Sequence, residues 1–134
     1  MYRLKRLIAT TALALASSAA FAADPTHGAI SRCFFVYAQI FETAKKLDNV
    51  PVLIYGQKRL AWVGGYMQAQ QNNPKLKSVF EGNLKGNKQA GVAIEARLTG
   101  AIRSGDAQEY IAVMNIAREC DKQLGLPTND IPPP

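Results

Sequence analysis

Residues 106–125 read DAQEYIAVMNIARECDKQLG, and this stretch predicts the clearest helix of the chain. Its apolar residues recur at steps of three and four, as they do along one face of a helix. They are Tyr110, Val113, Ala117, Cys120 and Leu124. Asp106 and Glu109 resemble a capping box at the start, with Asp in place of the usual Ser or Thr. Gly125 is a natural residue to follow the end of the helix.

Two earlier segments carry the same periodicity. The first begins at the helix-start signal Asp24–Pro25 and continues to Leu47. Pro51 ends it, because the residue before a proline is disfavoured in a helix. The second segment begins at about Val52 and continues to the turn that starts at Gln70.

A third pattern covers residues 74–103, with Asn73 as its cap and Pro74 as its first helical residue. It is either one long helix or two pieces, and we expect a bend or break near Gly86–Asn87. The sequence carries no strand-like alternation. It therefore predicts an all-α fold, a small up-and-down bundle of about four helices.

The first residues have the three parts of a secretory signal peptide. Residues 1–6 carry three basic side chains, residues 7–16 form a short apolar run, and Ala20-Phe21-Ala22 is a small-residue cleavage site. A membrane-spanning helix needs about 20 predominantly apolar residues, more than this run provides. We therefore expect cleavage before Ala23, with cleavage one residue later as the near alternative. We also expect export to the periplasm or beyond and no transmembrane helix after cleavage.

Removal of residues 1–22 leaves 112 of the 134 residues, the size of one domain. We expect residues 23–126 to form the helical-bundle domain. Residues 127–134 contain four prolines, which cannot sustain a helix. This segment is predicted to be a proline-rich flexible tail.

The two cysteines are predicted to form a disulfide, because cysteine pairs of exported proteins usually oxidise. With only Cys33 and Cys120 present, one intramolecular pairing exists. In a bundle with an even number of helices, the start of the first helix and the end of the last lie at the same end. The disulfide therefore joins the first and last helices, and it favours an even helix count.

The charge of the mature chain is modest. Three of the sixteen basic residues leave with the signal, so thirteen basic and ten acidic residues give a net charge of +3. Nucleic-acid binding is not indicated. A basic set could make weak contact with an anionic envelope surface, although a solvated helix face is the more common meaning of such a pattern. Its members are Lys75, Lys77, Lys85 and Lys88.

An aromatic stripe in the second helix is the candidate partner-binding surface. It consists of Tyr55, Arg59, Trp62 and Tyr66, at helical spacing. Tyr, Trp and Arg dominate binding hot spots, but helical aromatic stripes more often form the edge of a core. The nearby Gly64–Gly65 pair leaves room for another helix to approach closely.

No catalytic or metal-binding constellation is found. His27 has no partner acid or nucleophile at a fixed spacing. A structural zinc site needs four closely spaced ligands, and His27 is the one histidine of the chain. Met67 and Met114 are interpreted as core residues, because no histidine follows His27 to complete a haem site. Glu119 and Asp121 are interpreted as surface charges near a helix end. No cofactor is expected.

These features predict a non-enzymatic periplasmic interaction protein that binds a protein partner in the cell envelope through a helical face. An inhibitor, an immunity factor and an accessory subunit are proteins of this type. The alternative is a carrier of a small ligand or lipid, or an envelope-surface binding protein. An enzyme of unfamiliar type is a third class, which would require a polar residue in a closed pocket.

Overall fold

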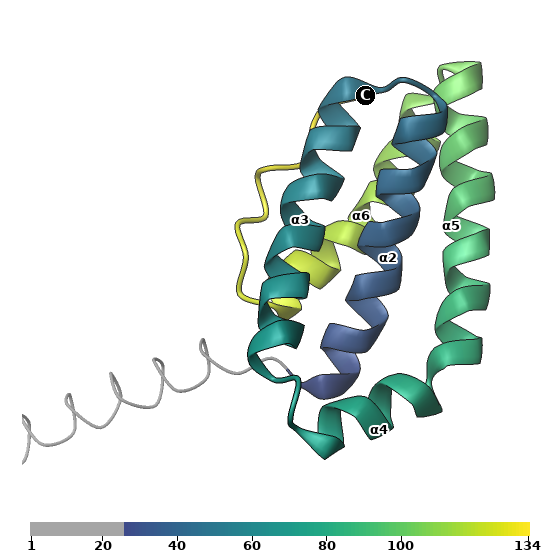
Figure 1. Cartoon of the computed structure of the whole chain (residues 1–134). Coiled ribbons are helices and arrows are strands. Elements are labelled where there is room, and N and C mark those ends of the chain that lie inside the picture. Colours follow the sequence, from purple (N-terminus) through teal and green to yellow (C-terminus); the bar gives the residue numbers. More distant parts are fainter. Residues whose placement is uncertain (1–25) are drawn as a thin grey trace, which may run out of the picture.

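The computed structural model describes residues 26–134, and within this range the chain forms five helices and no strand (Figure 1). The predicted signal peptide and its cleavage site lie outside the described residues. The helices are α2 (His27–Lys46), α3 (Val50–Ala69), α4 (Pro74–Gly82), α5 (Leu84–Ser104) and α6 (Ala107–Gln123). The all-α class is confirmed, but the described residues form five helices in place of about four, so the expected even count is not found among them.

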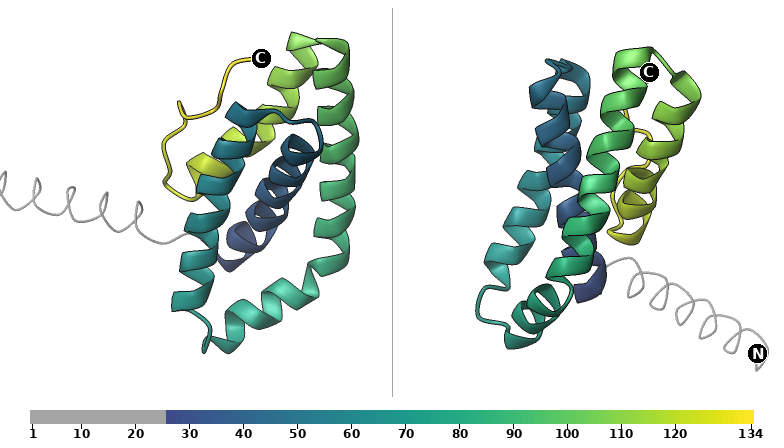
Figure 2. Two further views of the ribbon diagram at one scale, coloured as in Figure 1. Left: turned by 45° about the horizontal axis from the view of Figure 1, so that its top comes forward. Right: turned by 90° about the vertical axis from the view of Figure 1, so that its right-hand side faces the viewer.

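Helix α2 lies at the centre and packs against α3, α4, α5 and α6. The long helices α2, α3, α5 and α6 follow one another in alternating directions, and α4 crosses one end between α3 and α5 (Figures 1 and 2). The backbones of α3 and α6 do not come close to each other. Side chains must therefore fill the space between these two helices.

The extra helix arises from a break at Asn83, not at the expected Gly86–Asn87. The backbone N–H and the side-chain amide of Asn83 both donate to the carbonyl oxygen of Val79, which closes α4. Gly86 and Asn87 lie inside α5. A glycine costs a helix only about 1 kcal/mol relative to Ala, and the Asn87 amide donates to the Ser31 hydroxyl of α2 at 2.9 Å.

Side-chain caps fix the starts of four helices, and they are Thr26, Asn49, Asn73 and Asp106. The last two confirm the sequence interpretation. Helix α2 begins at His27, whereas the expected start signal Asp24–Pro25 lies outside the described residues. Helix α3 begins at Val50 instead of at about Val52, because proline is tolerated in the first turn, where its missing N–H has no helical partner.

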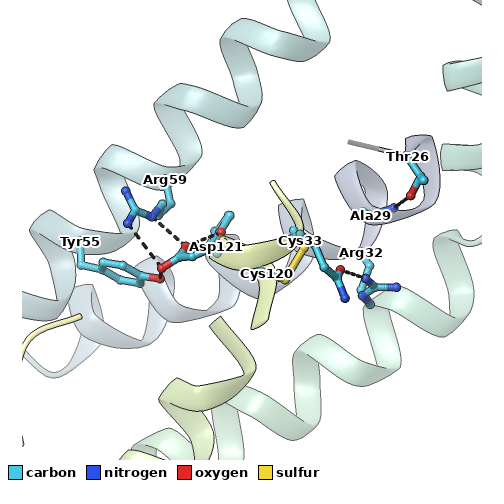
Figure 3. The surroundings of a disulfide bond; sticks show 10 residues. Thr26, Ala29, Arg32, Cys33, Tyr55, Arg59, Cys120 and Asp121 are labelled. Carbon is cyan, nitrogen blue, oxygen red and sulfur yellow. Dashed lines mark hydrogen bonds and ion pairs between the residues drawn. A yellow bond between two sulfur atoms is a disulfide. The ribbon is translucent and has the colours of Figure 1, made fainter. Parts of the chain in front are cut away.

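The disulfide between Cys33 and Cys120 is confirmed, with 5.6 Å between their Cα atoms. It joins α2, the first described helix, to α6, the last one (Figure 3). Gly105 follows α5 and Gly125 follows the cap of α6, and their φ angles are 68° and 70°. This left-handed backbone conformation ends each helix at little cost in a glycine.

Residues 127–134 form no helix and turn back along the bundle, where they contact α3 and α6. Ile131 packs against the core, and the carbonyl oxygens of Pro127 and Pro132 accept hydrogen bonds from the helices. The flexibility expected of this segment stays a prediction, which a measurement of its motion would test.

Candidate functional site

A buried charged cluster lies between α2, α3 and α6. Asp121 of α6 is fully buried beside the disulfide. Its carboxylate accepts hydrogen bonds from the Tyr55 hydroxyl (2.9 Å) and from Arg59 Nε (2.8 Å) (Figure 3). It also accepts one from the Tyr37 hydroxyl (2.6 Å). Both carboxylate oxygens are thus satisfied by donors from two other helices.

The local fold explains why these side chains meet. Tyr55 and Arg59 are one turn apart on α3 and are long enough to reach α6 across the space that the two backbones leave. The disulfide holds Cys120, and with it the adjacent Asp121, against α2. The Arg59 guanidinium also lies 5.0 Å from the centre of the Tyr55 ring, a distance at which a cation is attracted to an aromatic face.

Burial and charge set the protonation of the cluster. Burial, followed by the hydrogen bond to Asp121, raises the pKa of Tyr37 far above its usual range, and burial together with the charge of Asp121 does the same to the pKa of Tyr55. For Arg59, burial lowers the pKa, but the bond to Asp121 outweighs this and raises it. The tyrosines therefore stay protonated and Arg59 stays charged around neutral pH.

The prediction that Asp121 is a surface charge is wrong. Its neighbour Glu119 is exposed as expected, but Asp121 lies on the inward side of α6. The signal that sequence reasoning missed is the need of buried polar groups for hydrogen-bond partners. Tyr55 and Arg59 lie on the inward side of α3 among apolar residues, and buried donors require an acceptor. The carboxylate of Asp121, next to the disulfide-bonded Cys120, is the acceptor that these donors reach.

The aromatic stripe divides into two parts. Tyr55 and Arg59 are only 3% and 5% exposed, so they do not reach the surface. Trp62 and Tyr66 are half-buried against the edge of the core and stack on each other, with ring centres 5.9 Å apart. Only this second pair is available to a partner in the observed conformation.

The outward face of the C-terminal half of α3 carries no charge. Residues 60–74 contain no Asp, Glu, Lys or Arg. We define the α3 surface as the half-buried pair Trp62 and Tyr66 together with four exposed neighbours. These neighbours are Ala61, Gly64, Gly65 and Gln68. A Cβ atom built on either glycine would meet no atom within 4 Å in the described part of the chain. No helix of residues 26–134 therefore approaches the glycine pair.

The close helix approach is found at another glycine of α3. A Cβ atom at Gly56 would lie 3.1 Å from the backbone of Phe41 in α2. Gly56 thus lets α2 and α3 pack closely on the inward side, while Gly64 and Gly65 lie open on the outward side.

A small cleft lies where α3 turns into α4. It has an apolar floor of Met67, Leu76 and Phe80, a polar rim that includes Gln70 and Lys77, and a volume of about 220 Å³. This is below the range of about 300–1,000 Å³ that is typical of ligand pockets. The cleft suits at most a small, partly apolar molecule.

The predicted basic set is spread over two helices. Lys75 and Lys77 lie on α4, Lys85 and Lys88 lie on α5, and all four are exposed. Lys77 lies 3.9 Å from Glu81, so part of its charge is balanced. Contact with an anionic surface stays a prediction for this set.

Residues 26–134 contain no group of three or more His, Cys, Asp or Glu side chains placed to hold a metal ion. His27 lies half-buried in the first turn of α2 and lines an open groove with Lys75 and Ser78. None of the described helices is both long and apolar enough to span a membrane.

Comparisons with known proteins assign no family to the chain. No protein-family model, no curated protein and no solved structure matches the chain.

Proposed function

We propose that the protein is an exported, non-enzymatic interaction protein that binds a protein partner through the α3 surface. The observation that carries this proposal is a partly exposed aromatic pair within a segment of fifteen residues, 60–74, that has no charge. Charged residues make up 19% of the chain as a whole. Interface cores are depleted in charge and enriched in Tyr, Trp and Met.

The exposed glycines support the same proposal. At Gly64 and Gly65 the backbone of α3 is uncovered, so a partner could approach it closely, with Trp62 and Tyr66 as flanking anchors. The disulfide and the Asp121 cluster support α3 from behind. A surface held in this way loses little conformational entropy on binding, which favours affinity.

Export is part of the proposal and has its own test. The basic, apolar and small-residue parts of residues 1–22 support it, and a disulfide is the state expected outside a reducing cytosol. The intact mass of protein from the periplasmic fraction should correspond to a chain that begins at Ala23. A soluble species that retains residues 1–22 would contradict export by signal cleavage.

Site-specific photo-crosslinking tests the surface. A photoreactive residue is placed at Ala61 or Gly65 on the α3 surface and, as a matched control, at Ala96, an exposed alanine of α5. We expect irradiation of intact cells to give a discrete crosslinked species from the two α3 positions and not from the control. The proposal fails if the three positions give the same products or none.

The cleft between α3 and α4 supports a second candidate, the binding of a small apolar ligand. Its floor of Met67, Leu76 and Phe80 is the observation in favour. Native mass spectrometry of freshly purified protein would reveal a co-purified molecule, and Leu76→Gln should abolish its retention. Retention by this variant would place the ligand elsewhere.

A further inference from the structure

The segment 127–134 is held to the bundle in the way that a bound peptide is held. No backbone–backbone hydrogen bond joins it to residues 26–126. Side chains of the helices donate to it instead. Arg59 Nη2 donates to the carbonyl oxygen of Pro127 (2.9 Å) and to the carboxylate of Asp130 (3.1 Å), and the Tyr110 hydroxyl donates to the carbonyl oxygen of Pro132 (2.7 Å).

The groove that receives the segment is wider than the segment itself. A cleft of about 340 Å³ remains between the segment and α6, lined by Tyr110, Met114 and Arg118 on the helix side. A second cleft of about 330 Å³ lies between Pro134 and the ends of α5 and α6. Unfilled space beside a segment that lacks backbone pairing indicates a contact that can open locally.

The groove offers the features that recognise extended proline-containing peptides. Such peptides have few N–H donors and present carbonyl oxygens, which aromatic-lined grooves bind with side-chain donors. Here Tyr110 supplies the donor, Arg59 supplies a charged partner for an acidic residue, and Ile131 occupies an apolar position between them. Beside this position the Arg118 Nε is buried without a partner among the described residues, and Ile111 is 48% exposed.

We infer that the groove along α6, bordered by Arg59 of α3, is a binding site for an extended, proline-containing acidic peptide segment of a partner protein, and that residues 127–134 occupy it as an internal competitor. Charge complementarity indicates an acidic occupant. Arg59 forms its second ion pair with the carboxylate of Asp130, whose side chain is 45% exposed. The site is separate from the α3 surface, so this inference goes beyond the proposed function and does not depend on it.

Competition follows from the covalent link. A tethered segment acts at an effective concentration in the millimolar range, so a free peptide of similar affinity cannot displace it at micromolar concentration. A partner must either offer more contacts, for example in the unfilled clefts, or bind when the segment is released. A chain shortened by residues 127–134 should therefore bind such a peptide more tightly than the full chain does.

The test uses a fluorescent peptide with the sequence of residues 126–134, LPTNDIPPP, blocked at both ends. Its binding is measured by anisotropy to the full chain and to a variant that lacks residues 127–134. We expect the shortened variant to bind at least about tenfold more tightly than the full chain. A peptide with Asp130→Asn should bind at least about tenfold more weakly, because it loses a charge-assisted hydrogen bond.

Controls separate the groove from other effects. Circular dichroism first establishes that the shortened variant is folded. Tyr110→Phe in this variant should weaken peptide binding, because it removes the donor to the Pro132 carbonyl. Trp62→Ala, which alters the α3 surface, should leave peptide binding unchanged. The crosslinking test and the peptide-binding test therefore have independent outcomes, and either can fail without affecting the other.

If the shortened variant does not fold, a full-length variant replaces it. Asp130→Asn combined with Ile131→Ser weakens the internal segment and leaves the groove intact. It should bind the unaltered peptide at least about tenfold more tightly than the natural full chain. Failure of the folded variant to bind the peptide at millimolar concentration, or equal binding of the Asp and Asn peptides, would overturn the inference.

Discussion

Replacement of Asp121 by Asn tests whether the buried cluster stabilises the fold. The substitution keeps the shape of the side chain and removes its charge. One acceptor oxygen remains for the hydroxyls of Tyr37 and Tyr55 and for Arg59, which bond the carboxylate at 2.6 to 2.9 Å. The amide NH₂ group then faces donors in place of an acceptor, so at least one buried donor is left unsatisfied.

The expected loss is large for a substitution that changes so few atoms. Removing one partner of a buried ion pair costs about 3–5 kcal/mol. Asp130 still lies 3.1 Å from Arg59 and balances part of the charge. We therefore expect the lower end, about 3 kcal/mol of the free energy of unfolding. A single domain has only about 5–15 kcal/mol in total.

Urea unfolding of the oxidised protein, followed by Trp62 fluorescence, measures the effect. Glu109→Gln is the control, because it removes a carboxylate from an ion pair with Arg97 that is exposed to solvent. Tyr37→Phe should cost about 1.5–3 kcal/mol in the natural chain, as a hydrogen bond to a charged group does, and less in the Asn variant. An Asn variant as stable as the Glu109→Gln protein would refute the reasoning.

Four further outcomes are expected. Gly56→Ala should lower the free energy of unfolding by about 1–3 kcal/mol through overpacking against α2, whereas Gly64→Ala, which faces open space, should raise it by up to about 1 kcal/mol in the same urea assay. Reduction of the disulfide should remove up to about 4–5 kcal/mol, seen as a melting temperature lower by more than about 10 °C. Trp62→Ala should weaken partner binding by about 2 kcal/mol or more if the α3 surface is an interface; unchanged affinity with a large loss of stability would assign this side chain to the core instead. Burial raises the pKa of Tyr110 from 10.0 to about 12, so the folded state keeps a proton that the unfolded chain loses. Its stabilisation is complete below about pH 10 and declines as the pH rises through about 12, which urea midpoints from pH 8 to 11.5 would show.

The helices and the disulfide could be predicted from the sequence because both depend on local or unambiguous signals. Asn73–Pro74 and Asp106 mark helix starts by their own chemistry, and the structure places caps at Asn73 and Asp106. Cys33 had only Cys120 as a partner. The break at Asn83 was missed because the nearby Gly86 is a stronger breaker by propensity, yet it lies within α5.

The cluster could not be predicted because its cause is not local. Asp121 lies in the last turn of its helix, where a charged residue normally meets solvent. Three donors reach it only because α2 packs against that helix end and two long side chains of α3 extend to it. Likewise, the prolines of residues 127–134 exclude a helix but carry no information on which carbonyl oxygens meet Arg59 and Tyr110.

Arg59 joins two parts of the molecule that are held with different strength. Its Nε donates to Asp121 inside the core, whereas its Nη2 makes its shorter bonds, at 2.9 and 3.1 Å, to Pro127 and Asp130 of the segment. Nη2 also donates to the second carboxylate oxygen of Asp121, at 3.4 Å. Because the bond from Nε to Asp121 involves no atom of the segment, the segment can leave without breaking it. The guanidinium would then face the groove already charged and already oriented, and a preorganised cation of this kind is what binding of an acidic peptide requires. The residue that stabilises the core would thereby also create the binding site.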